Sequence, residues 1–206
     1  MTPRVFLVDD QPAVLKALSR LLVSAGLEVA SFGSAQAFLD SGNADAVGCL
    51  VLDLAMPGMN GMELQQALVA RESALPVIFL TGHGDIDTGV QAMKYGAADF
   101  LTKPVDGDKL LSAVHAAFEL NRQTLLDRAD IDEIEERLAS LTPREREVLA
   151  LVVEGKLNKQ AAAELGTVEK TIKVHRARVM TKMKVRSLAE LVRLVDRVGI
   201  HGVARD

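Results

Sequence analysis

The sequence predicts an α/β protein in which a doubly wound, five-stranded parallel sheet is followed by a small region built only from helices. Between residue 4 and about residue 120, five short apolar runs alternate with helical stretches, the pattern of a parallel sheet with right-handed crossovers. Residues 143–198 carry helical periodicity alone. The charge divides similarly, with 10 Lys and Arg against 20 Asp and Glu in residues 1–140 (net −10) and 14 against 8 in residues 141–206 (net +6). The two parts are therefore expected to face different partners.

The strands come from short runs rich in Val, Leu, Ile and Phe that are bounded by polar residues, Gly or Pro. The run CLVL is continuously apolar, which indicates a strand buried on both faces. We expect strands at 5–8, 28–32, 49–52, 76–80 and 99–103. We expect helices at 12–25, 34–40, 61–71 and 85–95, and a further helix from about residue 106.

A charged helical segment joins the two parts. Within and just after it, apolar residues recur at 3-4-3 spacing: Ile131, Ile134, Leu138 and Leu141. That spacing suits a linker helix that pairs with its copy in a dimer. We therefore expect a first domain at 1–121, a linker helix at 122–140 and a second domain at 141–206.

The second domain is expected to contain four helices. Thr142 is a good N-cap, Pro143 fits the first helical position, Glu145 makes the first turn acidic, and Gly155 ends the helix. The other helices are expected from about Asn158 to Leu165, from about Val168 to Met183 and from about Ser187 to Val198.

The composition excludes several classes of protein. Cys49 is the only cysteine, so no disulfide framework is possible, and its position before an apolar run predicts a small buried side chain. No stretch approaches the 18 apolar residues of a membrane span. The start MTPRVFLVDD becomes acidic where a signal peptide would stay apolar. We expect a cytoplasmic protein without membrane partners.

The expected strands end in residues that carry chemistry. These are Asp9-Asp10, Asp53, Thr81-Gly82 and Lys103-Pro104. Because parallel strands place their carboxyl ends on one rim of the sheet, these residues are expected to meet there. We expect Asp53 to emerge at this rim, exposed to solvent and to a metal.

Three carboxylates at one rim repel one another and need a cation at neutral pH. Mg²⁺, or Mn²⁺, fits because it takes a few carboxylates and keeps positions for phosphate oxygens. Lys103 adds a positive charge and Thr81 a hydroxyl, both suited to phosphoryl oxygens, and Gly82 leaves space for the group.

The motifs DD at 9–10, D at 53 followed by MPG at 56–58, T at 81 and KP at 103–104 resemble the receiver domain of two-component response regulators, a flavodoxin-like fold. TGHGD at 81–85 and GAADFLTKP at 96–104 are most similar to the FixJ-like branch. The resemblance implies the following roles. Asp53 accepts the phosphoryl group; Asp9, Asp10, Asp53 and the backbone carbonyl of Ala55 hold the metal; Lys103 binds the phosphoryl group; and Thr81 and Phe100 form a switch pair.

The sequence differs from that family at two positions that affect the phosphoryl site and the switch. Ala55 has no polar side chain to contact the phosphoryl group or its hydrolytic water, which leaves the phosphate lifetime open. Phe100 lacks a hydroxyl, so only its packing can report the switch.

His83 lies in a Gly-His-Gly turn and is interpreted as a structural or solvated residue.

Residues 141–198 resemble the LuxR/NarL-type DNA-binding domain, a four-helix helix-turn-helix fold, through LTPRE at 141–145, NK at 158–159 and TIKVH at 171–175. On the third helix, Ile172, Val179 and Met183 form the apolar stripe, with His175 beside it. The resemblance implies that Lys173, Val174 and Ala177 approach base edges and that Lys170, Arg178 and Lys182 meet phosphates. It also implies a dimer surface on the last helix.

Two helix starts depart from that family. Leu157 stands where a serine or threonine usually caps the second helix, so Asn158 is expected to cap instead. At positions 167 and 168 the family usually has an apolar residue and then a capping residue, whereas this sequence has Thr167 and Val168. We expect this change to start the third helix about one residue early.

The favoured interpretation is a transcriptional response regulator. A cognate histidine kinase phosphorylates Asp53, the first domain dimerises, and the freed second domain binds double-stranded promoter DNA, with RNA polymerase as a further candidate partner. In the resting form the acidic first domain is expected to cover the basic third helix. No catalytic residue is expected beyond Asp53.

Two alternatives stay open. An aspartyl-nucleophile phosphatase of the haloacid-dehalogenase kind would place an Asp-x-Asp pair on the first strand, whereas Asp9 and Asp10 are adjacent and the expected nucleophile is on the third strand. A DNA-binding or interaction module could also act without phosphorylation.

Overall fold

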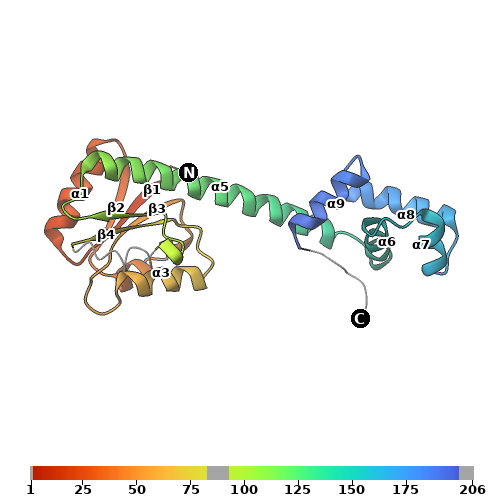
Figure 1. Ribbon diagram of the computed structural model, residues 1–206, viewed down its shortest axis with the longest axis horizontal. Coiled ribbons are helices and arrows are strands. Elements are labelled where there is room, and N and C mark those ends of the chain that lie inside the picture. Colours follow the sequence, from red (N-terminus) through yellow and green to blue (C-terminus); the bar gives the residue numbers. More distant parts are fainter. Residues whose placement is uncertain (1, 83–92, 200–206) are drawn as a thin grey trace. The chain divides into compact units, whose positions relative to one another are not determined.

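The computed structural model describes residues 2–82 and 93–199. The chain divides into two compact units, Met1–Leu125 and Leu126–Asp206 (Figure 1). None of the helices in the described ranges is both long and apolar enough to cross a membrane.

The first unit is built on a five-stranded sheet in the order β2-β1-β3-β4-β5, with every neighbouring pair parallel. The strands are β1 (Arg4–Val8), β2 (Glu28–Phe32), β3 (Gly48–Asp53), β4 (Val77–Thr81) and β5 (Asp99–Thr102). The expected sheet is confirmed. The strand order reverses between β1 and β3, and such a reversal opens a crevice at the carboxyl ends of those strands.

Helices cover both faces of the sheet. They are α1 (Pro12–Ser24), α2 (Ala35–Asp40), α3 (Gly61–Ala70) and α5 (Gly107–Ala139), with a short 3₁₀ turn, η1, at Asn43–Asp45. Figure 1 shows α1 and α5 on one side of the sheet and α3 on the other. The helix expected at 85–95 lies almost entirely outside the described residues.

The alternation of side chains along each strand produces two cores. Phe6 and Phe79 pack with Phe38 of α2 and Leu64 of α3 on one face. The opposite core joins side chains of β1, β3 and β4 to α1 and α5, and consists of Val5, Leu7, Cys49, Val51, Ile78, Leu80, Leu22, Leu110 and Val114, with smaller alanines. Cys49 is fully buried, which confirms the expected buried side chain, and this burial raises the pKa of its thiol to about 12.

A buried amide fixes α5 to the base of the sheet. The side chain of Asn121 is fully buried; its Oδ1 accepts a hydrogen bond from the Gly48 N–H at 3.0 Å, and its Nδ2 donates to the Ala74 carbonyl at 2.7 Å. Gly48 has φ +151°, and a Cβ there would collide with the Arg4 carbonyl, so this close approach requires glycine.

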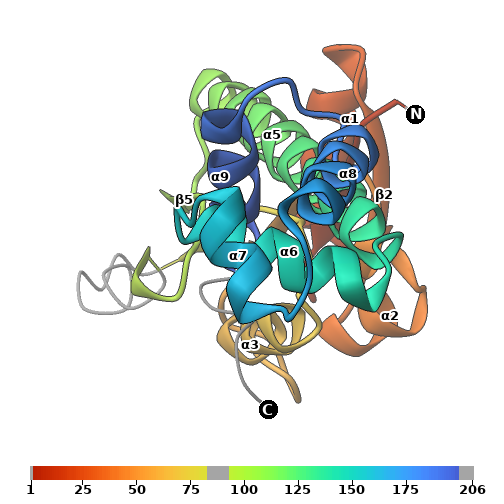
Figure 2. The ribbon, with the colours of Figure 1, turned by 90° about the vertical axis from the view of Figure 1, so that its right-hand side faces the viewer.

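The second unit contains α6 (Pro143–Val153), α7 (Asn158–Glu164), α8 (Glu169–Lys182) and α9 (Leu188–Arg197). α6 and α7 pack against α8, and α9 packs against α6 (Figure 2). Val148, Ile172, Val179 and Leu191 are fully or almost fully buried at the centre of this core. The expected small all-helical fold is confirmed.

The linker expectation was wrong about where its apolar residues go. α5 continues without a break to Ala139, but Ile134 is 3% exposed and Leu138 and Leu141 belong to the core of the second unit. Their 3-4-3 spacing therefore serves packing inside the unit.

The helix starts of the second unit also correct two expectations. Thr142 caps α6 in a capping box with Glu145, as expected. Leu157, and not Asn158, is the N-cap of α7, and its N–H donates to Gln160 Oε1 at 2.8 Å. α8 begins at Glu169 after Val168 as N-cap, so it does not start early.

Candidate functional site

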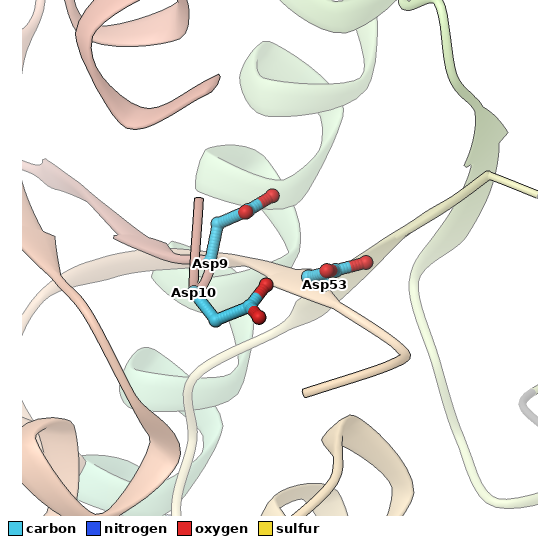
Figure 3. A group of neighbouring side chains, drawn as sticks. All are labelled: Asp9, Asp10 and Asp53. Carbon is cyan, nitrogen blue, oxygen red and sulfur yellow. The ribbon is translucent and has the colours of Figure 1, made fainter. Parts of the chain in front are cut away.

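Sheet register brings three carboxylates together at the carboxyl rim. Val8 of β1 lies beside Leu52 of β3, so the next residues, Asp9 and Asp53, lie side by side. Asp10 follows Asp9 in the chain. One carboxylate oxygen from each acid falls within a group whose members all lie within 4.8 Å of one another (Figure 3). The spatial cluster predicted from Asp9, Asp10 and Asp53 is present.

Lys103 supplies the counter-charge from the end of β5. Its Nζ lies 2.6 Å from Asp9 Oδ2 and 3.1 Å from Asp53 Oδ1. The Lys103 N–H donates to the Thr81 carbonyl at 2.6 Å, which ties the residue to β4. The Gln11 N–H donates to Asp9 Oδ1 at 2.8 Å, so both oxygens of Asp9 are engaged.

At both Asp53 and Lys103, burial and the neighbouring charges shift the pKa in opposite directions. Burial raises the pKa of Asp53, and the Lys103 ammonium only partly offsets this. Burial lowers the pKa of Lys103, but hydrogen bonds to Asp9 and Asp53 outweigh it and the pKa is raised overall. Lys103 therefore stays protonated at neutral pH.

The expectation that Asp53 is exposed was wrong. Asp53 is 3% exposed and Asp9 is 2% exposed, whereas the neighbouring Ala55 is exposed. Asp53 is the last residue of a strand that is buried along its whole length, and the ammonium of Lys103 lies against it. Sequence alone does not show how closely a lysine on another strand end covers the acid.

The donor set fits a hard divalent cation. Asp10 Oδ1 is buried and has no hydrogen-bond partner among the residues that the structure describes, so a charged oxygen is left for a ligand. Two oxygens bound to one Mg²⁺ at about 2.1 Å lie at most about 4.2 Å apart. Neighbouring oxygens in the octahedral shell lie closer, about 3 Å apart, so the carboxylate oxygens, which lie within 4.8 Å of one another, would draw together around the ion.

Three further predicted residues lie on the adjoining strands β4 and β5 or directly after them. Thr81 ends β4 and is 5% exposed, beside Thr102 of β5. Gly82 is exposed, and a Cβ there would meet no atom of the described residues within 4 Å. Phe100 lies beside Phe79 and packs, partly buried, against the core. His83 lies outside the described residues.

Helix α8 is divided between core and solvent as predicted. Ile172, Val179 and Met183 are fully or almost fully buried. The expected contact residues on the other side are all exposed: Lys170, Lys173, Val174, Ala177 and Arg178. Residues 156–186 hold nine basic residues against two acidic ones, so this exposed face is positively charged. His175 is partly buried, beside the stripe.

Lys182 is engaged inside its own unit. Its Nζ lies 2.7 Å from Glu145 Oε2 and donates to the Ser140 carbonyl at 2.9 Å. Glu145 is 3% exposed, and its hydrogen bonds with Lys182 and the Thr142 N–H lower its pKa to about 2. The sequence predicts Glu145 only as an acid in the first turn of α6.

Two family models match the chain. The model described as "Response regulator receiver domain" matches residues 5–115, and "Bacterial regulatory proteins, luxR family" matches residues 139–195.

Named relatives match over nearly the whole length. The chain is 46% identical to "Response regulator protein TodT" of Pseudomonas putida over 94% of this chain and 86% of the relative. It is 43% identical to "Transcriptional regulatory protein FixJ" of Bradyrhizobium diazoefficiens over 95% of this chain and 96% of the relative.

Solved structures of response regulators are also similar to this chain. A low-resolution structure of the response regulator StyR shares 47% identity and a TM-score of 0.83, covering 96% of this chain and 100% of that one. Full-length FixJ from B. japonicum shares 42% identity and a TM-score of 0.59, covering 98% and 100%.

Proposed function

Because the chain belongs to the two-component response regulators that carry a luxR-family DNA-binding domain, we propose that it controls transcription through phosphorylation of Asp53 by a cognate histidine kinase. The observation that carries this proposal is the meeting of Asp53 with Asp9, Asp10 and Lys103 at one rim of the sheet. Such a family member is a regulator and not a typical enzyme. Its chemistry is confined to gaining and losing one phosphoryl group at Asp53.

In the proposed transfer, an Asp53 oxygen attacks the phosphorus of a phosphohistidine. The new P–O bond forms as the P–N bond breaks, and the leaving imidazole takes up a proton. Asp9, Asp10, Asp53 and the Ala55 carbonyl would hold Mg²⁺ or Mn²⁺. The bound cation would neutralise charge on the phosphoryl oxygens. Lys103, kept protonated by its two carboxylate partners, would turn its ammonium to a phosphoryl oxygen.

The proposed switch uses Thr81 and Phe100. Thr81 ends β4 near the acidic rim, and its hydroxyl would turn toward the phosphoryl group. Phe100 is partly buried, which leaves its ring a more buried position to occupy. The ring would move inward, and the receiver surface near β5 and α5 would change and favour a homodimer.

The output is proposed to be the binding of double-stranded promoter DNA. Lys173, Val174 and Ala177 would approach base edges, and Lys170 and Arg178 would meet phosphates; all five are exposed on α8. Lys182 would reach a phosphate only by leaving Glu145. α9 would form the dimer surface on DNA.

The proposal extends to the domain bounds, the cellular location and the resting state of the protein. We assign residues 1–121 to the receiver, 122–140 to the linker helix and 141–206 to the output domain. We place the protein in the cytoplasm, with RNA polymerase as a candidate partner. In the resting state the acidic receiver, net −10 with the linker, would cover the basic face of α8.

The test combines phosphorylation with DNA binding. Full-length protein with Mg²⁺ and acetyl phosphate should gain one phosphoryl group by mass spectrometry, shift toward dimer and bind selected duplex DNA more tightly. Asp53→Asn should do none of these. Asp40→Asn, which changes an exposed acid on α2, is the matched control and should behave as the unmodified chain. An equal gain of affinity in Asp53→Asn would overturn the proposal.

A further inference from the structure

The four helices of the second unit begin in two different ways. The side chains of Thr142 and Ser187 cap α6 and α9 by accepting hydrogen bonds from the Glu145 and Glu190 N–H groups. α7 and α8 have Leu157 and Val168 as N-cap residues, and neither makes a side-chain cap. Ser, Thr, Asp or Asn at these positions would favour folding. An apolar residue at both starts therefore has no explanation in helix stability.

These two side chains are also exposed. Leu157 is 70% exposed and Val168 is 64% exposed, and Val174 on the outer face of α8 is 45% exposed. In residues 141–199, which the structure describes, they are the only large apolar side chains that are this exposed. Leu157 and Val168 directly precede α7 and α8, the two consecutive helices of the helix-turn-helix, and Val174 lies on α8.

Exposed lysines lie close in sequence to these apolar side chains. Lys159 of α7 and Lys170 of α8 are exposed close in sequence to Leu157 and Val168. The acidic Glu169, next to Val168, is paired with the exposed Lys173 at 3.0 Å. A surface that is apolar within a basic frame matches a partner that offers apolar groups between rows of negative charge.

The DNA major groove has that composition. Its rims are phosphates, and the apolar group that its base edges present is the 5-methyl of thymine. In a helix-turn-helix, the first residues of the recognition helix contact base edges, and Val168 stands at the start of α8. We infer that Val168 contacts the methyl group of one thymine in each half-site and sets the sequence preference there. This inference rests on the proposed DNA binding.

The test removes the methyl group alone. Duplexes are first selected by the acetyl-phosphate-treated full-length protein from a randomised pool. Each thymine of the selected half-site is then replaced by uracil, which keeps the hydrogen-bonding edge and lacks the methyl. At one thymine the replacement should weaken binding by about fourfold, the value of burying one methyl group. With Val168→Ser this position should show no difference between thymine and uracil.

The variant separates recognition from folding. Serine restores a polar N-cap to α8, so the melting temperature of Val168→Ser should equal or exceed that of the unmodified chain. Val69→Ser is the matched control, because Val69 is a 62% exposed valine on α3 of the first unit. It should keep the full thymine-to-uracil effect.

Each outcome has a distinct meaning. If Val168→Ser keeps the fourfold loss at every sensitive thymine, or if the unmodified chain is indifferent to every replacement, the assignment to Val168 is wrong while DNA binding stands. If no duplex is enriched from the pool, the proposed function fails, and this inference fails with it.

Discussion

The carboxylate of Asp10 is the least satisfied charge at the rim of the sheet. One of its oxygens is buried without a partner in the described part of the chain, and two further carboxylates lie beside it. We expect Asp10→Asn to stabilise the metal-free protein by about 1 kcal/mol, because it removes repulsion between like charges. Urea unfolding with a chelator present measures this free energy.

The same variant should lose its response to Mg²⁺. At a concentration 100 times its dissociation constant, a ligand of the folded state stabilises it by about 2.7 kcal/mol. The unmodified chain should approach this value and Asp10→Asn should fall well short of it. Asp40→Asn should respond as the unmodified chain does. Equal Mg²⁺ responses in all three proteins would remove Asp10 from the metal site.

Glu145 is expected to make the second unit sensitive to acid. Its pKa is lowered to about 2 when folded, so its contribution to stability is complete above the ordinary carboxyl range near 4.5 and is lost as the pH falls toward 2. Glu145→Gln should flatten the dependence of unfolding free energy on pH in this window and lower stability at pH 7. Circular dichroism during thermal unfolding at several pH values measures both effects.

Glu147→Gln is the control on the same helix. Glu147 forms an exposed pair with Arg144, and such pairs contribute at most about 1 kcal/mol. This variant should keep the acid dependence of the unmodified chain. A similar flattening in both variants would show that Glu145 is not the source.

Residue-level prediction succeeded where the information is local. Asp9, Asp10 and Asp53 could be placed together because strand ends are visible in the sequence and parallel strands share a rim. The burial of Asp53 and the pair between Lys182 and Glu145 could not be predicted. Each depends on side chains from distant segments, 50 residues apart for Lys103 and Asp53 and 37 for Lys182 and Glu145.

At the scale of elements, α5 contributes to two cores. Leu110 and Val114 pack under the sheet, while Ile134 is buried in the second unit. We expect Ile134→Ala to destabilise the second unit by about 2–4 kcal/mol and to leave the first unit unaffected. Leu126→Ala, at a 49% exposed position of the same helix, should change stability by less than about 0.5 kcal/mol.

Hydrogen exchange in the full-length protein distinguishes the two effects. Amides of α6 and α8 should exchange faster in Ile134→Ala, and amides of β1, β3 and β4 should keep their rates. Equal loss of protection in both units would contradict this division of α5 between two cores.

The type and order of the helices and strands could be predicted from the sequence, but what their apolar faces contact could not. The five strands and the four helices of the second unit were visible from periodicity and caps such as Thr142. The helical pattern of Ile134 and Leu138 was equally visible, but spacing alone does not tell whether an apolar stripe meets its own unit or another copy. Asn158 was misassigned as a cap because a polar residue next to an apolar one is the ordinary signal.

At the scale of the whole molecule, the opposite charges of the two parts lead to a prediction about salt. If the receiver covers α8 at rest, the unphosphorylated full chain should bind a selected duplex more weakly than the fragment 126–206 does at about 0.1 M salt. The affinity ratio between them should approach one as salt rises, because screening weakens attraction between exposed charges. Since salt weakens DNA binding by both proteins, the ratio isolates the receiver. A ratio independent of salt and phosphorylation would exclude electrostatic cover.

Cys49 gives the molecule a practical property. The only thiol of the chain is buried in the core of the first unit, and burial raises its pKa to about 12, so it is a poor nucleophile toward maleimides in the folded protein. New cysteines at exposed positions such as Val69 and Leu157 would be labelled selectively without removing the natural residue. A donor and acceptor dye pair on the two units would then follow, in single molecules, how their separation responds to phosphorylation and to DNA.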